Sequence, residues 1–263
     1  MWILSSMGRP DRIRKLVDSY AWSAGHSPVM LTLAERDARL HEYLSQEWPD
    51  SWRIEIVPML GNGPTYNEIL RRYPDEPCYG FLADDQILET SGMLVDLELA
   101  ACDWNVAYAN DKHHGEAIPT MPCLGGELVR AVGYLSPRSI IHWGIDCCWY
   151  EIGKRLGTLR YMPRLTYEHE NPVWGTAPDD RTYRLARQRS FGYHDLFRAW
   201  VFGGELSAAV ERVNERRGAT ALSPRPPGQA DKPLAAHNRT EQGLSDIVQM
   251  HTRGAEDAYT GSK

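Results

Sequence analysis

Two adjacent carboxylates end a strongly apolar stretch of this sequence. Residues 79–88 read YGFLADDQIL, so Asp84 and Asp85 follow a hydrophobic run directly. Hard oxygen donors in such a place suit Mg²⁺ or Mn²⁺, which bind through one or two carboxylates together with substrate phosphates. The alternative is a solvated turn in which one Asp caps the next helix. These residues alone leave the two interpretations evenly balanced.

Two segments further along the chain could act on a substrate beside this pair. Asp146, in HWGIDCCWY, is expected in the first turn of a helix, as a stabilising carboxylate or as a general base facing a cleft. If Asp146 is a general base, Trp143 would form a wall of the cleft on which a substrate could stack. His169, in LTYEHENP, ends an extended segment and is either a packed histidine or a metal ligand. His113 and His114 lie in a polar loop and are interpreted as substrate contacts.

The first polar loop, SSMGRPDR, carries Arg9, Asp11 and Arg12 at the start of an expected helix. These residues either open the helix only, or recognise a phosphate or base at its N-terminus. The loop fits neither GxGxxG nor GxxxxGK[ST], so it signals neither a dinucleotide site nor a P-loop. No GxSxG occurs and no cysteine has an evident activating histidine, which leaves no candidate nucleophile.

Alternating strands and helices place the first loop and the acidic pair together. The expected strands are residues 2–4, 29–33, 54–57 and 79–83, and the helices between them begin at Pro10, near Leu40 and at Thr65, which forms a capping-box pattern with Glu68. Short strand–helix units predict a doubly wound α/β fold, a mostly parallel sheet flanked by helices. Ligands bind at the carboxyl ends of the strands in such sheets, where both segments lie.

The second half of the sequence is less regular. Strands are expected at 106–109 and within 159–169, with a short segment at 121–124, and helices at 127–132, 144–156, 179–200 and 205–217. After Gly218 a Pro- and Gly-rich composition predicts a linker and a flexible tail, with a short docking helix near Ile247. The expected organisation is a domain over residues 1–203 and a C-terminal extension over residues 204–263.

Composition excludes several classes of protein. The net charge of −6 does not indicate a broad nucleic-acid-binding surface. The five cysteines are scattered without CxxC spacing, which argues against a zinc site and a disulfide framework. No apolar run reaches the roughly 18 residues of a membrane span, and the N-terminus lacks a signal-peptide pattern. A cytoplasmic protein without membrane contact is therefore predicted.

Together these motifs resemble those of a GT-A nucleotide-sugar glycosyltransferase. LADDQ resembles the acidic "DxD" motif in shortened form, HWGIDCCW the segment that supplies the base of inverting members, and TYEH the late strand whose histidine completes the metal site. GPTYNEILRRYPDEPCYGFLADD matches the helix and strand before the acidic motif. The resemblance covers residues 1–200. Gln86 stands where the motif has its last Asp, so Asp85 is assigned to the metal and Asp84 to a ribose or sugar contact.

The resemblance implies a hexosyl- or pentosyltransferase that uses Mn²⁺ or Mg²⁺. Asp85 and His169 would hold the ion on the donor diphosphate, and Asp146 would take the proton from the acceptor hydroxyl, with inversion at the anomeric carbon. The remaining implied contacts are Arg9, Asp11, Asp37 and Asn67 for the nucleotide, and Trp143 and His114 for the acceptor or sugar. A UDP-sugar is favoured over a GDP-sugar as donor.

The acceptor stays open at the level of sequence. A small chain without an anchor resembles glycosyltransferases of bacteriophages and prophages, which implies a bacterial or infected-host cytoplasm and hydroxymethylated DNA, a virion protein or a glycan as acceptor. The arginine-rich segment 181–198 favours DNA if it contacts phosphates; a solvated basic helix face is the alternative.

Two other functions compete with glycosyl transfer. A sugar nucleotidyltransferase would carry a lysine- and glycine-rich first loop, which SSMGRPDR is not. A non-catalytic nucleotide-sugar binding module would use Asp146 only to begin a helix.

Overall fold

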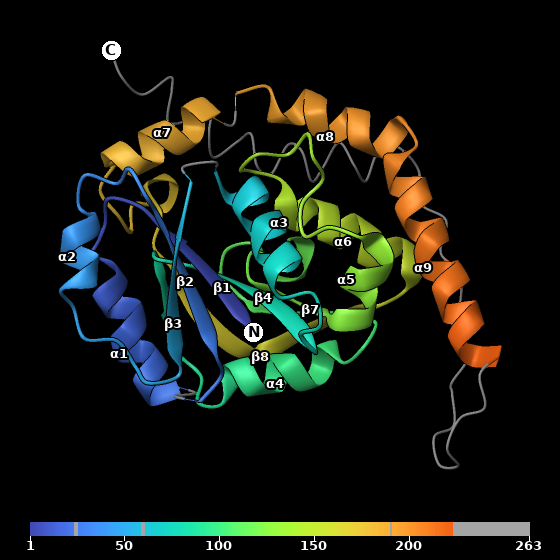
Figure 1. Ribbon diagram of the computed structural model, residues 1–263, viewed down its shortest axis with the longest axis horizontal. Helices are drawn as coiled ribbons and strands as arrows, with labels where there is room; N and C mark the ends of the chain where they lie inside the picture. Colours follow the sequence, from blue (N-terminus) through green and yellow to red (C-terminus); the bar gives the residue numbers. More distant parts are fainter. Residues whose placement is uncertain (24–25, 59–60, 190, 223–263) are drawn as a thin grey trace.

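The computed structural model describes residues 1–23, 26–58, 61–189 and 191–222 (Figure 1). The strands in these ranges are β1 (Trp2–Ser6), β2 (Val29–Ala34), β3 (Trp52–Val57), β4 (Cys78–Ala83), β5 (Gln86–Leu88), β6 (Val106–Asn110), β7 (Pro122–Gly125) and β8 (Leu159–His169). The helices are α1 (Ile13–Ser23), α2 (Leu40–Leu44), α3 (Asn62–Arg72), α4 (Met93–Ala101), α5 (Gly126–Val132), α6 (Ile145–Leu156), α7 (Arg181–Arg189), α8 (Tyr193–Phe202) and α9 (Glu205–Leu222). Two 3₁₀ turns are η1 (Gly115–Ala117) and η2 (Pro172–Trp174).

The strands form one curled sheet in the order β3-β2-β1-β4-β7-β6-β8-β5. β1 pairs in parallel with β2 and with β4, and β2 pairs in parallel with β3. The chain order therefore reverses beside β1, and such a switch point leaves a crevice at the carboxyl ends of the strands. Ser6 and Asp84 lie at these ends. The predicted α/β fold with a mostly parallel, helix-flanked sheet is confirmed.

The other half of the sheet mixes directions. β7 is antiparallel to both β4 and β6, β8 is parallel to β6, and the short β5 is antiparallel to β8. The sequence did not predict β5, because three residues are too few to show a periodicity. Its register pairs Gln86 with His169. This pairing brings the end of the acidic motif beside a histidine that lies more than eighty residues further along the chain.

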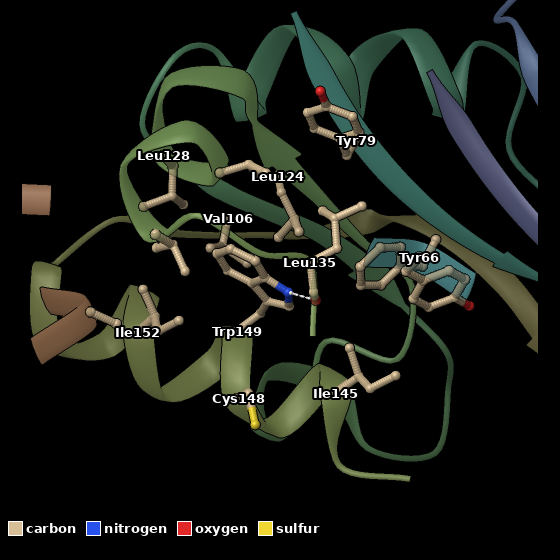
Figure 2. Close-up of a cluster of buried hydrophobic side chains, with 14 of the residues drawn as sticks. Tyr66, Tyr79, Val106, Leu124, Leu128, Leu135, Ile145, Cys148, Trp149 and Ile152 are labelled. Carbon is tan, nitrogen blue, oxygen red and sulfur yellow. Dashed lines mark hydrogen bonds between the residues drawn. The ribbon is translucent and has the colours of Figure 1, made fainter. Parts of the chain in front are cut away.

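Each face of the sheet carries its own hydrophobic core. One core joins α1 and α4 to the sheet, and the other joins α3, α5, α6, α8 and α9 to it. Figure 2 shows the second core around Trp149 of α6, which is fully buried. The indole Nε1 of Trp149 donates a hydrogen bond of 2.8 Å to the carbonyl oxygen of Leu135, so burial leaves no unpaired donor there.

Two helix boundaries differ from the sequence prediction. The helix expected over 179–200 is two helices, because Gly192 adopts a left-handed conformation (φ 75°) at the start of α8. The capping box at Thr65 does not begin α3, which starts at Asn62. Gly63 packs so closely on the loop between α5 and α6 that an added Cβ would lie 2.2 Å from the carbonyl oxygen of Ile140. This tertiary contact extends the helix by a turn.

The helix expected at the start of the C-terminal extension is confirmed as α9. Leu206, Ala209 and Val213 of α9 are fully buried in the second core. The predicted linker, tail and docking helix lie outside the described residues, and the division at residue 203 stays a prediction. Within the described ranges, no helix has the length and apolar character needed to cross a membrane.

Candidate functional site

A cavity of about 440 Å³ lies at the carboxyl ends of β1, β2 and β4. The starts of α3 and α6, the segment after β8, and α7 complete its walls. Its size is that of an ordinary small-molecule site. Of the predicted site residues, the lining includes Arg9, Asp84, Asp85, His114, Trp143, Asp146 and His169.

The positive charge opposite the acidic pair belongs to Arg9. Its guanidinium is buried, and Nη1 lies 3.0 Å from Asp84 Oδ1 and 3.8 Å from Asp85 Oδ2. The remaining donors, Nε and Nη2, bind both carboxylate oxygens of Asp180 at 2.8 Å. Asp84 also accepts a 2.6 Å hydrogen bond from the hydroxyl of Ser6. Three carboxylates thus surround one guanidinium, which leaves a net negative charge at the site.

The helix α7 closes this cluster from above the strand ends (Figure 1). The ring of Tyr183 stacks under the guanidinium of Arg9 at 4.0 Å, a cation–π contact. The Tyr183 hydroxyl lies 2.9 Å from Asp85 Oδ2 and 2.6 Å from the carbonyl oxygen of Glu170, so one proton is shared between two acceptors. Asp180 accepts from the backbone N–H of Tyr183, which fixes the first turn of α7.

Asp85 and His169 face each other with unused polar atoms. His169 Nε2 lies 3.5 Å from Asp85 Oδ1. Asp85 Oδ1 and His169 Nδ1 are buried and have no hydrogen-bond partner among the described residues. The backbone holds the pair in place, since the N–H of Glu170 donates to the carbonyl oxygen of Asp85 at 2.8 Å. His169 meets Asp85 Oδ1 at ion-pair distance without a hydrogen bond, and a buried carboxylate oxygen without a hydrogen bond would be satisfied by a cation bound beside it.

Burial and the neighbouring charges shift the pKa values of Asp84, Asp85 and His169. Burial raises the pKa of Asp85, but the facing His169 and Arg9 outweigh burial and lower it to about 2. Burial raises the pKa of Asp84, and the neighbouring charge of Asp85 adds to this against the pull of Arg9. Burial lowers the pKa of His169, but Asp85, followed by Asp111 and Asp146, raises it above its ordinary value.

The residues present fit a divalent ion that a substrate helps to coordinate. No group of three or more His, Cys, Asp or Glu in the described part of the chain could hold a metal alone. Asp85 and His169 offer two donors, and Mg²⁺ and Mn²⁺ commonly take their other ligands from substrate phosphates and water. The fit rests on the unpartnered Asp85 Oδ1.

Asp146 reaches the cavity from the first turn of α6, as predicted. Gly144 caps this helix in a left-handed conformation (φ 90°), which lets the chain turn sharply after Trp143. The apolar side of α6 is buried, whereas Asp146 is half-buried and lines the cavity. Its Oδ1 accepts a 2.8 Å hydrogen bond from the N–H of Cys147. This hydrogen bond holds the side chain at the N-terminal end of the helix.

Three predicted nucleotide contacts are placed elsewhere, since the cavity lining does not include Asp11, Asp37 or Asn67. Asp11 is exposed and pairs with Arg39. Asp37 accepts from the backbone N–H of Gly8 at 2.6 Å, so it shapes the first loop. Asn67 holds the loop at 135–136 through three hydrogen bonds.

Several residues that build the cavity were missed by sequence reasoning. Asp180 and Tyr183 approach Arg9 and Asp85 from a distant helix, and nothing local in the sequence signals that approach. Trp174, in the turn after β8, lines the cavity with its ring centroid 5.7 Å from that of His169. Asp111 binds His114 Nδ1 at 2.7 Å. Only this last residue left a signal, an acidic side chain three positions before a histidine.

No protein-family model and no curated protein matches this sequence. Among solved structures, the chain is similar to the mannosyltransferase PcManGT from Pyrobaculum calidifontis in complex with GDP-Man and Mn²⁺, at TM-score 0.59 and 10% identity over 98% of this chain and 83% of that chain. It is also similar to S. aureus TarS, at TM-score 0.49 and 11% identity over 63% of this chain and 35% of that chain.

The first of these likenesses, with the sheet order described above, establishes the fold class. The chain has the α/β fold of GT-A nucleotide-sugar glycosyltransferases, which its sequence motifs predicted.

Proposed function

We propose that this chain is a glycosyltransferase that moves a sugar from a nucleotide-sugar donor to an acceptor hydroxyl, with inversion. The observation that carries the proposal is the unpartnered, buried Oδ1 of Asp85, 3.5 Å from His169 Nε2, in a cavity that Asp146 also lines. A cation site and a candidate base thus share one enclosed space at the switch point of the sheet.

The nucleotide would bind in the half of the cavity formed by β1, β2 and α3. Small and polar side chains line this half: Ser5, Thr32, Ala34, Asn62 and Thr65. Arg9 lines the cavity as well, with its guanidinium paired to Asp84 at 3.0 Å. The sequence favours a UDP-sugar, and GDP-mannose is tested beside it because PcManGT was solved with GDP-Man.

Asp85 and His169 would hold Mn²⁺ or Mg²⁺ beside the donor diphosphate. When bound, the ion would act as a Lewis acid and neutralise the charge that develops on the leaving diphosphate. Tyr183 orients Asp85 through its hydroxyl, as hydrogen-bonded neighbours of metal ligands commonly do.

Asp146 would act as the general base. Its carboxylate would take the proton of the attacking acceptor hydroxyl as the oxygen forms its bond to the anomeric carbon and the bond to the diphosphate breaks. General base catalysis of this kind contributes about 10²–10⁴-fold to the rate. Attack on the face opposite the leaving group inverts the configuration.

Calorimetric titration with UDP and GDP, with and without Mn²⁺, tests the core of this proposal. Wild type should bind one of the two nucleotides only when Mn²⁺ is present. Asp85→Asn and His169→Ala should abolish this Mn²⁺-dependent binding. Glu168→Gln is the matched control, because Glu168 neighbours His169 but pairs with Lys112 and His113 instead. Metal-independent binding, or no binding of either nucleotide, would refute the assignment of the ion to this pair.

The predicted bacteriophage or prophage origin, cytoplasmic location and acceptors stay predictions. Hydroxymethylated DNA, a virion protein and a glycan were the acceptors considered from the sequence. If the protein is instead a non-catalytic binding module, wild type would bind nucleotide but would release no nucleoside diphosphate from a nucleotide-sugar. Asp146→Asn would then change neither nucleotide binding nor this release.

A further inference from the structure

Asp111 is a buried carboxylate whose surroundings are built to hold it ionised. Its side chain is 1% exposed, and it accepts hydrogen bonds from the backbone N–H groups of His113, His114 and Gly115 at 3.0, 2.7 and 3.3 Å. The hydroxyl of Thr120 adds another at 3.0 Å. Burial raises the pKa of Asp111, but the hydrogen bonds from His114 and from the backbone N–H groups together outweigh burial and hold the pKa well below its usual range.

The proposed catalytic groups do not include this carboxylate, yet it orders a side chain that lines the cavity. His114 Nδ1 lies 2.7 Å from Asp111 Oδ2. A carboxylate that accepts from Nδ1–H fixes the tautomer and makes Nε2 the acceptor nitrogen of the ring. Trp174 fixes the ring plane as well, since its ring meets that of His114 edge-on with centroids 5.1 Å apart. A buried carboxylate that holds a partly buried histidine of the cavity wall is a costly arrangement for packing alone.

The ring of Trp174 links this pair to the proposed metal site. Trp174 contacts the rings of both His114 and His169. His114 therefore lies near the proposed metal ligand His169, in the same cavity that Asp146 lines, where the transferred sugar and the acceptor would meet in the proposed function.

The charge of the lining points to the chemical class of the acceptor. The two arginines of the cavity wall are engaged within the chain, Arg9 by Asp84 and Asp180, and Arg187 by Asp179 at 2.7 Å. A polyanionic backbone needs unengaged cations, and here it would meet carboxylates. A neutral molecule rich in hydroxyls matches the imidazole and carboxylate groups better.

We propose that the acceptor is a neutral saccharide and that His114 contacts one of its hydroxyls beside the attacking one. Asp111 is a positioning residue that acts through His114. This inference rests on the proposed function and adds the acceptor class and the residue that selects it.

Two rates measured on one preparation separate this inference from the proposed function. The first is donor hydrolysis, the release of nucleoside diphosphate from GDP-mannose or a UDP-sugar without acceptor. The second is the additional release with an array of neutral mono- and disaccharides, or with an oligonucleotide that contains hydroxymethylcytosine.

His114→Gln should leave nucleotide affinity and donor hydrolysis within about twofold of wild type. It should raise the acceptor KM about tenfold with a smaller change in kcat, because one hydrogen bond to the substrate is lost. Asp111→Asn should shift the acceptor KM in the same direction, since the amide no longer fixes the imidazole. Glu116→Gln is the matched control: Glu116 lies two positions after His114, its side chain is exposed and it is not part of the cavity lining, so the acceptor KM should stay unchanged.

An unchanged acceptor KM in His114→Gln would overturn the role of His114 while leaving the proposed function intact. A loss of donor hydrolysis in this variant would assign His114 to the donor sugar instead, and would also overturn it. Stimulation of wild type by the oligonucleotide and by no saccharide would overturn the acceptor class. Failure of wild type to bind any nucleotide would refute the proposed function itself.

Discussion

The guanidinium of Arg9 is expected to stabilise the fold more than any other charge at the site. It is 6% exposed and meets Asp84 at 3.0 Å and Asp180 at 2.8 Å. At an effective dielectric constant of about 20, the attraction to Asp84 alone amounts to about 5–6 kcal/mol, which desolvation of both groups partly offsets. Replacing Arg9 with Met keeps most of the volume but leaves the buried carboxylates without their counter-ion.

Removing one partner of a buried ion pair costs about 3–5 kcal/mol. Arg9→Met should therefore lower the free energy of unfolding by about this amount, and the melting temperature by about 6–20 °C. Chemical denaturation followed by circular dichroism measures the loss. Because the cost arises from a buried charge, adding Asp84→Asn to Arg9→Met should recover about half of it.

Arg36→Met is the control, since Arg36 is 83% exposed and forms a surface ion pair with Glu35 at 3.8 Å. It should change the stability by less than about 0.5 kcal/mol. A loss below about 1 kcal/mol in Arg9→Met, or no recovery in the double variant, would contradict the view that Arg9 compensates the acidic pair.

Three further variants test other parts of the structure. Asp146→Asn should keep Mn²⁺-dependent nucleotide affinity and lower sugar transfer by about 10²–10⁴-fold, and unchanged turnover in a rate assay would remove it as the base. Asn67→Ala should lower the free energy of unfolding by about 1–3 kcal/mol in chemical denaturation, because the N–H of Ser136 loses its acceptor. Its nucleotide affinity should stay constant. Weaker nucleotide binding by the folded variant would instead support the predicted role of Asn67 as a nucleotide contact. Burial raises the pKa of Glu151, whose Oε1 has no hydrogen-bond partner in the described structure, so the folded state disfavours its ionised form. Glu151→Gln should therefore stabilise the protein by about 0.5–2 kcal/mol at pH 7, with a gain that shrinks as the pH falls and the wild-type carboxyl takes up its proton; a gain independent of pH between 4 and 7 would contradict this reasoning.

The sequence by itself determined the alternation of elements and the order of the chemical groups. The apolar run that forms β4 is buried along its length apart from its last residue, as expected of a strand without polar alternation. The helical spacing of α6 left Asp146 off the apolar side, and the polar residues after β1 and β4 marked the ligand-binding edge. These features are local, because burial and periodicity are written into neighbouring residues.

Only the tertiary structure decided which charges meet. The register of β5 against β8 brings Asp85 to His169, and closure of α7 over the strand ends brings Tyr183 to both Asp85 and Arg9. A pair of buried carboxylates after a strand requires a positively charged partner. The sequence does not say whether that partner is a metal ion or an arginine, because either one neutralises the carboxylates. In YGFLADDQIL that partner is Arg9, with one oxygen of Asp85 left over for a cation.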